Sequence, residues 1–281
     1  GLGNQFLANI REVDAIIHVL RCFDDDNVIH VDGNVNPVSD KEIIDLELQL
    51  KDLETIEKRI GAIERKAKSG DKESEKIYKV YNQAREHIVS GNSIRSLDID
   101  EGLFKFLDEL QLITAKPVIY VCNVDEKSVI HGNFHVDNVK ELVANENAEI
   151  LILGAGIESD IAELDDFEER KMFLEDLGLE EPGVSKLIKN AYSLLNLQTY
   201  FTAGEKEVRA WTIKKGMTAP QAAGVIHTDF EKGFIKAEVI KFSDFVEYGS
   251  ESSVKEAGKL MIQGKEYVVN DGDVMHFRFN V

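Results

Sequence analysis

Two short polar segments carry residue types that can recognise a nucleobase. The first, Asn123–Glu126, directly follows the apolar run 116–123. An asparagine amide can pair with N6 and N7 of adenine at the same time, and Val124 can offer an apolar face to the ring. The second, Gly154–Gly156, follows the apolar run 148–153, and glycine lets backbone amides approach a ligand closely. Each segment also has a purely structural interpretation, either as a turn that caps the next helix or as a plain strand-to-helix turn.

His30 is one of seven histidines, the residue type whose ordinary pKa lies nearest to pH 7. It lies in residues 24–37, which are rich in Asp, Asn, Gly and Pro and therefore predict a long loop. A neutral imidazole near pH 7 can accept a proton from water or hold a water molecule in position. Taken alone, an exposed loop histidine without a chemical role is the simpler interpretation. The two cysteines, Cys22 and Cys122, lack metal-ligand spacing, so we expect reduced, buried thiols, a cytoplasmic protein and no metal site in this chain.

Three apolar runs predict the strands that would position these residues. Residues 15–23, 116–123 and 148–153 read as buried strands, and helical patterns separate them. This alternation predicts an α/β layer with a parallel sheet covered on both faces. The expected helices of this part of the chain are residues 5–14, 136–145, 161–177 and 183–195.

A helical hairpin interrupts the α/β pattern. Ser39-Asp-Lys-Glu42 has the form of a capping box and precedes apolar residues at spacings of three and four. Ser69 and Gly70 break this run, and a second helix is expected over residues 72–89. The short connection favours antiparallel neighbours, and a third helix over residues 101–111 returns the chain.

The pattern changes again after Leu195. Residues 198–203 and 207–213 predict paired strands, and residues 219–227 predict a helix. Further strands are expected at residues 234–240, 265–269 and 274–281. Two strands, a helix and further short strands within about 85 residues predict a β-grasp module.

The net charge of −19 limits the partners of the chain. Fifty-two acidic and 33 basic residues produce a field that repels phosphate backbones, so any contact with nucleic acid needs a local basic patch. No run approaches 18 apolar residues, which excludes a membrane-spanning helix from the prediction. The sequence leaves the oligomeric state open, and a monomer is the simplest expectation.

Three segments together resemble the YchF family, whose members are similar to the Obg GTPases in fold but are described as preferring ATP. They are residues 15–23 with the following loop, residues 120–126, and residues 197–234 with the ending Asp271-Gly-Asp-Val-Met-His-Phe277. The last of these is similar to the TGS module of threonyl-tRNA synthetases. The resemblance spans essentially the whole chain.

The resemblance implies a P-loop NTPase sheet with an inserted helical hairpin and a C-terminal TGS domain of β-grasp type. The implied domains are 1–38 with 111–196 for nucleotide binding, 39–110 for the helical insert, and 197–281 for the TGS domain. No Gly-x-x-x-x-Gly-Lys-Ser/Thr occurs in the sequence. We therefore expect that the phosphate-binding loop and the Mg²⁺ ligands lie upstream of Gly1, and that this chain alone is inactive.

The resemblance also implies roles for single residues. Asn123-Val-Asp-Glu126 stands where guanine-binding relatives have Asn-Lys-x-Asp, and it fits a preference for ATP. The implied nucleotide-binding residues are Asn123, Val124, Glu126, Gly154, Ala155, Gly156 and Phe23. His30 is implied as the catalytic residue that orients water.

The TGS module implies contact with RNA or the ribosome. The candidate contacts are Lys206, Arg209, Lys214, Lys215, Lys232 and Lys236, with Trp211, Phe230 and Phe234 interleaved. The leading hypothesis is an ATPase that acts as a ribosome-associated switch. The alternative is a non-enzymatic adaptor that binds RNA or the ribosome.

Overall fold

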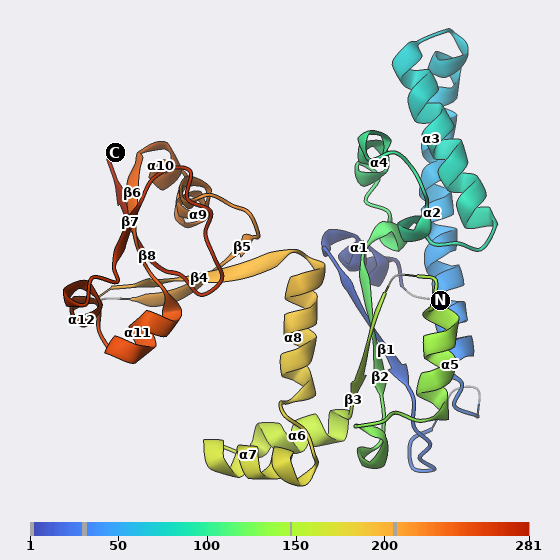
Figure 1. Ribbon diagram of the computed structural model, residues 1–281. Coiled ribbons are helices and arrows are strands. Elements are labelled where there is room, and N and C mark those ends of the chain that lie inside the picture. Colours follow the sequence, from blue (N-terminus) through green and yellow to red (C-terminus); the bar gives the residue numbers. More distant parts are fainter. Residues whose placement is uncertain (1–2, 30–32, 147, 205–206, 281) are drawn as a thin grey trace. The chain divides into compact units, whose positions relative to one another are not determined.

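The computed structural model describes residues 3–29, 33–146, 148–204 and 207–280 (Figure 1). The chain forms two compact units, Gly1–Ala191 and Tyr192–Val281. No helix within the described residues is long and apolar enough to cross a membrane.

The first unit is built on a three-stranded parallel sheet. Its strands β1 (Ile16–Arg21), β2 (Val118–Asn123) and β3 (Glu149–Leu153) lie in the order β1-β2-β3. The register pairs Arg21 with Asn123, and Asn123 with Leu153, so all three strands end at the same edge. The predicted α/β layer with its parallel sheet is confirmed.

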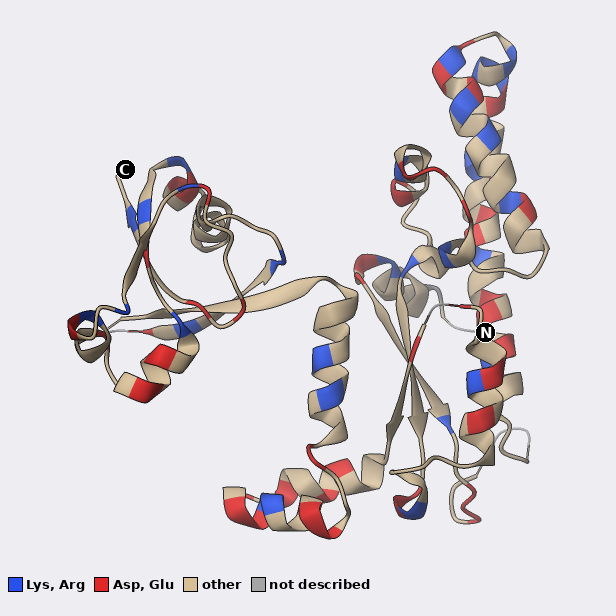
Figure 2. Cartoon of the chain, viewed as in Figure 1, with Lys and Arg blue, Asp and Glu red and all other residues tan. Residues whose placement is uncertain are grey.

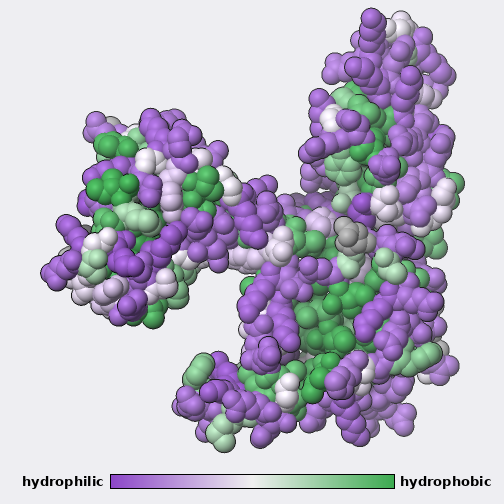
Figure 3. All heavy atoms as spheres, viewed as in Figure 1, coloured by the Kyte–Doolittle hydropathy of each residue, from purple (hydrophilic) through white to green (hydrophobic). Residues whose placement is uncertain are grey.

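The expectation that both faces of the sheet are covered is wrong at β1. On one face, the side chains of β2 pack against α5 (Phe134–Val143), and Tyr120 is completely buried. On the other face, Ile17 and Val19 of β1 are 47% and 61% exposed. Figure 3 shows a hydrophobic area in the region where Figure 1 draws these strands. The apolar run predicted burial correctly only for residues that face a covering element.

The helical insert forms an antiparallel arm. Its two long helices are α2 (Pro37–Lys68) and α3 (Lys72–Val89), which meet at a turn where Gly70 has a φ of +92°. The predicted capping box is wrong, because the side chain of Asn36 caps α2 by accepting from the Ser39 N–H at 3.2 Å. Asparagine at the N-cap with proline as the first helical residue is a strong start signal, so α2 begins two residues before Ser39.

A buried carboxylate, that of Asp52, links the arm to the segment that precedes β2. Asp52 is fully buried, and its oxygens accept from the Ile113 N–H at 2.9 Å and the Thr114 N–H at 2.7 Å. The Thr114 hydroxyl donates to the same carboxylate at 2.8 Å. The chain returns to this point through α4 (Glu101–Asp108). Asp52 therefore ties α2 to the segment that leads into β2.

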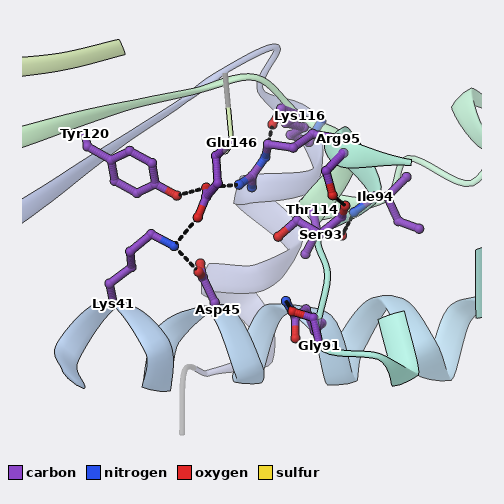
Figure 4. Close-up of polar contacts among 12 residues, drawn as sticks. Lys41, Asp45, Gly91, Ser93, Ile94, Arg95, Thr114, Lys116, Tyr120 and Glu146 are labelled. Carbon is purple, nitrogen blue, oxygen red and sulfur yellow. Dashed lines mark hydrogen bonds and ion pairs between the residues drawn. The ribbon is translucent and has the colours of Figure 1, made fainter. Parts of the chain in front are cut away.

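A second polar cluster joins the arm to the sheet (Figure 4). The ammonium of Lys41 on α2 lies 2.5 Å from Asp45 and 2.6 Å from Glu146. The hydroxyl of Tyr120 on β2 donates to Glu146 at 2.6 Å, and Arg95 lies 3.5 Å from the same carboxylate. Because Lys41 is almost completely buried, this charge is stable only with its partners in place.

Three helices follow β3. They are α6 (Ala155–Glu163), α7 (Phe167–Asp176) and α8 (Gly183–Leu194). The helix predicted over 183–195 is confirmed by α8, whereas the single helix predicted over 161–177 is wrong, because α6 and α7 are separate. Leu164 adopts an extended conformation and ends α6. The Asp166 side chain then caps a new helix by accepting from the Glu168 N–H at 2.8 Å. The N-terminal helix α1 (Asn4–Glu12) precedes β1.

The second unit has a five-stranded sheet in the order β5-β4-β8-β6-β7. This mixed order is that of a β-grasp fold, as predicted. The strands are β4 (Leu197–Ala203), β5 (Val208–Lys214), β6 (Phe234–Ile240), β7 (Met261–Gln263) and β8 (Val274–Phe279). The helices are α9 (Ala219–Ile226), α10 (Thr228–Lys232), α11 (Phe242–Tyr248) and α12 (Glu251–Glu256).

Two details of this unit differ from the sequence prediction. The strand predicted at 265–269 is wrong: β7 lies earlier, and within that range only Val268 forms an isolated bridge, with Thr218. Helices α10, α11 and α12 were not predicted. An apolar cluster forms the core, with Tyr200 donating its buried hydroxyl hydrogen to the Ala222 carbonyl at 2.9 Å, and the carboxylate of Asp273 is also completely buried.

Candidate functional site

The candidate site lies at the edge where the three parallel strands end. Asn123 is the last residue of β2, and Gly154 directly follows β3. The Asn123 amide oxygen accepts a hydrogen bond from the Ala155 N–H at 2.9 Å. The two segments singled out from the sequence are therefore in direct contact. The Asn123 amide nitrogen has no hydrogen-bond partner among the described residues, and the oxygen retains a second lone pair.

Val124 does not lie as the sequence predicted. Its side chain is only 4% exposed and packs into the core beneath the sheet, so it does not offer a free apolar face to a ring. Alternation along the strand explains this, because Val124 points to the same face as Tyr120 and Cys122, which α5 covers. Its backbone N–H donates to the Leu153 carbonyl at 2.9 Å and continues the pairing of β2 with β3.

The two acids of the first segment have different environments. Asp125 caps the short 3₁₀ helix Glu126–Ser128, because its carboxylate accepts from the Ser128 N–H at 3.1 Å. Glu126 is exposed at the start of this turn. The capping interpretation is thus fulfilled by Asp125, while the carboxylate of Glu126 faces solvent at the strand-end edge.

The glycines after β3 are not equivalent. A Cβ atom at Gly154 would lie 3.2 Å from the side chain of Ile157, which is a tight contact inside the unit. A Cβ at Gly156 would meet no atom within 4 Å. Ala155 and Gly156 are exposed at the first turn of α6. Packing within the unit therefore explains Gly154 but gives no reason for a glycine at position 156.

Arg21 organises the segment that follows β1. Its guanidinium donates to three backbone carbonyls, those of Phe23 at 3.2 Å, Val28 at 2.8 Å and Asp25 at 3.2 Å. It also lies 4.8 Å from the centre of the Phe23 ring. The role of Arg21 was not predicted, although a lone cation at the end of an apolar run was a signal for it in the sequence. Arg21 fixes the backbone directly before the segment that carries His30.

Asn133 connects the ends of β1 and β2. Its amide nitrogen donates to the Cys22 carbonyl at 2.7 Å and lies 3.3 Å from the Ser128 hydroxyl. Its amide oxygen accepts from the Val136 N–H at 3.2 Å and caps α5. Sequence reasoning missed this residue as well, because only its capping role has a local signature.

The two cysteines lie next to each other beneath this edge. Cys22 and Cys122 are both free and completely buried, which confirms the prediction of reduced, buried thiols. A hydrogen bond from one thiol to the other and burial raise the pKa of Cys22 far above its usual value. The pair is therefore part of the neutral core.

Some predicted positions lie outside the described residues. His30, the candidate catalytic residue, is one of them, and Lys206 is another. Within the described residues, no group of three or more His, Cys, Asp or Glu side chains could hold a metal ion.

In the second unit, aromatic and aliphatic side chains line a pocket of about 530 Å³, with Glu207 at its wall. Trp211, Phe230 and Phe279 contribute to its wall, and the Arg209 guanidinium lies 4.1 Å from the centre of the Trp211 ring. Phe234 does not take part, because it is 4% exposed and belongs to the core.

The remaining candidate cations of this unit differ in their surroundings. Lys214, Lys215 and Lys232 are exposed. Lys236 lies 3.8 Å from Glu238, so its charge is partly compensated.

The fold is that of an α/β protein whose parallel sheet carries an inserted helical arm and is followed in the chain by a β-grasp unit. The YchF-GTPase_C family model, described as "Protein of unknown function (DUF933)", matches residues 197–280. The chain is 52% identical to the ribosome-binding ATPase YchF of Bacillus subtilis, over 100% of this chain and 77% of that protein. The protein of the same name from Escherichia coli O157:H7 is also 52% identical, with the same coverage. This chain belongs to the YchF family.

A solved structure supports this assignment. The Schizosaccharomyces pombe YchF GTPase matches with a TM-score of 0.83 and 37% identity, covering 99% of this chain and 75% of that one. A GTP-binding protein from Pyrococcus horikoshii matches with a TM-score of 0.58 at 18% identity and shows likeness in fold alone.

Proposed function

We propose that this chain carries the base-binding part of an ATPase that acts as a ribosome-associated switch and prefers ATP over GTP. The names of the curated relatives, ribosome-binding ATPases, support the general activity and the ribosome as partner. The observation that carries the proposal is the hydrogen bond between the Asn123 amide oxygen and the Ala155 N–H. It aligns an asparagine amide with exposed backbone at the edge where open α/β sheets bind ligands. A ribosome partner would place the protein in the cytoplasm.

The preference for adenine follows from the hydrogen-bonding groups at this edge. The free amide nitrogen of Asn123 can donate to adenine N7, and its oxygen can accept from the N6 amino group. Guanine offers an oxygen in place of that amino group, which would face the Asn123 oxygen without a hydrogen between them. Guanine also presents N1–H and a 2-amino group that need a carboxylate at a fixed distance. Glu126 is one methylene longer than the aspartate of guanine-binding relatives, so it fits that role poorly.

The phosphates and Mg²⁺ need residues that these 281 do not supply. The sequence contains no Gly-x-x-x-x-Gly-Lys-Ser/Thr motif, and such a loop both cradles the phosphates and holds the metal through its hydroxyl. We place these groups upstream of Gly1, and we expect the chain alone to hydrolyse ATP very slowly. Bound Mg²⁺ would neutralise charge on the phosphates.

His30 is our candidate for orienting the attacking water. The supporting observation is that Arg21 holds the backbone of residues 23–28 through three carbonyls, so the following residues start from a fixed point. A histidine on a loop could approach the phosphates when nucleotide binds and withdraw afterwards.

Calorimetric titration of ATP and GTP, with Mg²⁺, tests the proposal in two proteins. One is the 281-residue chain, and the other is the protein encoded by the complete gene. We expect the complete protein to bind ATP at least tenfold more tightly than GTP, and the shorter chain to bind either nucleotide only weakly. Absence of nucleotide binding in both proteins would contradict the proposal and favour a non-enzymatic adaptor.

A further inference from the structure

The distal end of the helical arm differs in charge from the rest of its unit. We call residues 58–79, the end of α2 with the start of α3, the arm tip. It carries eight cations and four acids, in a chain whose net charge is −19. Figure 2 shows Lys and Arg concentrated at this end of the arm. All eight cations are exposed: Lys58, Arg59, Arg65, Lys66, Lys68, Lys72, Lys76 and Lys79.

These cations are largely uncompensated within the chain. Only Lys68 has a carboxylate within 4.0 Å among the described residues, at 2.7 Å from Glu64. The carboxylate of Asp71 accepts from the Ser74 N–H at 2.9 Å and caps α3. By contrast, Lys41 near the other end of α2 has two carboxylate partners. Seven neighbouring unpaired cations repel one another, and a polyanion would remove this cost.

The spacing of the cations places them on the outer faces of both helices. On α3, Lys72, Lys76 and Lys79 recur at intervals of four and three, which forms one stripe along a helix. Ile77 and Tyr81, which lie on a different face of α3, pack in the cluster that holds Ile56 and Ile60 of α2. The positive charge of α3 therefore faces away from the partner helix.

Helix α2 repeats this arrangement. Lys58 and Arg65 are seven residues apart, as are Arg59 and Lys66, so the four side chains share a broad face. Ile60 and Ala67 are buried, and Ile60 packs in the cluster that holds Val80 and Tyr81 of α3. Positive charge thus surrounds the arm tip on more than one side. A single straight phosphate backbone would contact only one of the two stripes.

The arm tip lacks what a protein interface requires. Protein–protein interfaces have an apolar centre with few charges. Every exposed large hydrophobic residue of α2 lies in its first half, at Ile43, Leu46 and Leu50, and none of those described lies within 58–79. Contact with a phosphodiester backbone requires cations and no apolar anchor.

We propose that the arm tip binds the phosphodiester backbone of folded RNA by entering a crevice that has phosphates on more than one side. The 32 residues of α2 form a rod of about 48 Å, which presents the tip far from the strand-end site of its own unit. This inference rests on the proposed association with the ribosome, and it names the partner's chemistry and the contacting segment.

The test uses the 281-residue chain, purified bacterial ribosomes, and protein-free, refolded ribosomal RNA. One variant combines Lys72→Gln, Lys76→Gln and Lys79→Gln, and a second combines Lys58→Gln, Arg65→Gln and Lys66→Gln. Glutamine keeps helix propensity, and all six positions are exposed. The matched control combines Lys105→Gln, Lys171→Gln and Lys189→Gln, three exposed lysines on other helices of the same unit. Circular dichroism verifies that the helix content is unchanged.

We expect each tip variant to bind both probes at least tenfold more weakly, and the control to change affinity less than twofold. The slope of log K against log salt should fall by about two to three for each tip variant, because each phosphate contact contributes about 0.7–0.9. Unchanged affinity of both tip variants, with ribosome binding by the parent chain intact, overturns the inference and leaves the proposed function standing.

Three further outcomes also overturn the inference. Loss of affinity in only one of the two variants contradicts the crevice geometry. If the parent chain binds ribosomes but not protein-free RNA, and the tip variants lose ribosome binding, the partner is an acidic protein. Failure of the parent chain to bind ribosomes or RNA removes the ribosomal role together with the inference.

Discussion

The two units differ in what holds their sheets together. In the first unit, the buried side chains of Asp52 and Lys41 and their hydrogen-bond partners form what we call the polar frame; both residues are at most 2% exposed. Val19 of the edge strand of its sheet is 61% exposed. The second has an apolar core in which Tyr200 and Val239 are completely buried, and beside it one buried carboxylate, Asp273, which lies 2.7 Å from the Lys241 ammonium. Assembly of the first unit therefore depends on a few directional contacts between distant segments. In the second unit an apolar core is accompanied by contacts of Asp273 that join residues only 6 and 32 apart in sequence.

The same division appears in the charge. Residues 192–281 hold 11 basic and 12 acidic side chains, whereas residues 1–191 hold 22 and 40. The acidic character of the chain therefore belongs almost entirely to the first unit, where the arm tip is the exception. Repulsion of polyanions should be weakest at the arm tip and over the second unit.

Removing the central carboxylate of the polar frame should produce the largest change in stability. Asp52→Ala leaves two backbone N–H groups and one hydroxyl without their acceptor in a buried place. We expect the first unit to lose about 3 kcal/mol or more. Far-UV circular dichroism during urea unfolding would measure this, with the exposed Asp108→Ala as the control.

The chain's single tryptophan, Trp211, reports on the second unit in the same experiment. Its fluorescence transition should stay within about 0.5 kcal/mol of that of the parent chain. If the Trp211 transition shifts as far as the circular dichroism transition, the two units unfold together. That result would contradict the view that different contacts stabilise the two units.

The first unit should also lose stability as the solution becomes acidic. Burial is the main reason why the pKa of His18 is lowered; Lys41 and Arg95 lower it further, while Asp45 and Glu146 oppose the shift. The folded unit thus disfavours the charged imidazole. Stability is complete above the unfolded pKa of about 6.5 and falls as pH decreases from there toward the folded pKa, by up to about 1.4 kcal/mol per pH unit.

His18→Phe provides the control for this pH dependence. Unfolding of the variant between pH 7 and pH 5, followed by circular dichroism, should lack the component due to His18. Equal pH dependence of the parent and the variant would show that this histidine does not titrate on unfolding in that range.

The smallest effect is expected in the second unit. Tyr200→Phe removes the hydroxyl that donates to the Ala222 carbonyl in the core, while the ring and its burial remain. We expect a loss of about 1 kcal/mol in the Trp211 transition and no change in the circular dichroism transition of the first unit. A loss above 3 kcal/mol would indicate that polar contacts also dominate this core.

Local sequence patterns predicted much of the fold. The apolar spacing over residues 72–89 predicted α3 with its observed bounds, and three apolar runs predicted β1, β2 and β3. The predicted helix boundaries were wrong where a single capping side chain, and not the spacing of apolar residues, determined where the helix begins. Asn36 started α2 early, and Asp166 started α7 within a stretch predicted to be one helix.

Only those parts of the candidate site that lie at the ends of strands could be predicted from the sequence. Parallel strands end at a common edge, so proximity of Asn123 to Gly154–Gly156 followed from the order of elements. The contribution of Asn133 could not be predicted, since its contact with the Cys22 carbonyl joins residues 111 apart in sequence. Val124 was assigned to the wrong side because an apolar run does not reveal which face a covering helix takes.

The most direct test of the central claim compares ATP and GTP affinity in the complete protein and in its Asn123→Ala variant. Each good bidentate pair with a base contributes about 1–3 kcal/mol of discrimination, so the ratio of the two Kd values should fall at least fivefold in the variant. Asn92→Ala, an exposed change on the arm, should leave the ratio unchanged. An unaltered ratio in Asn123→Ala would contradict an adenine-selective site at the edge where β1, β2 and β3 end.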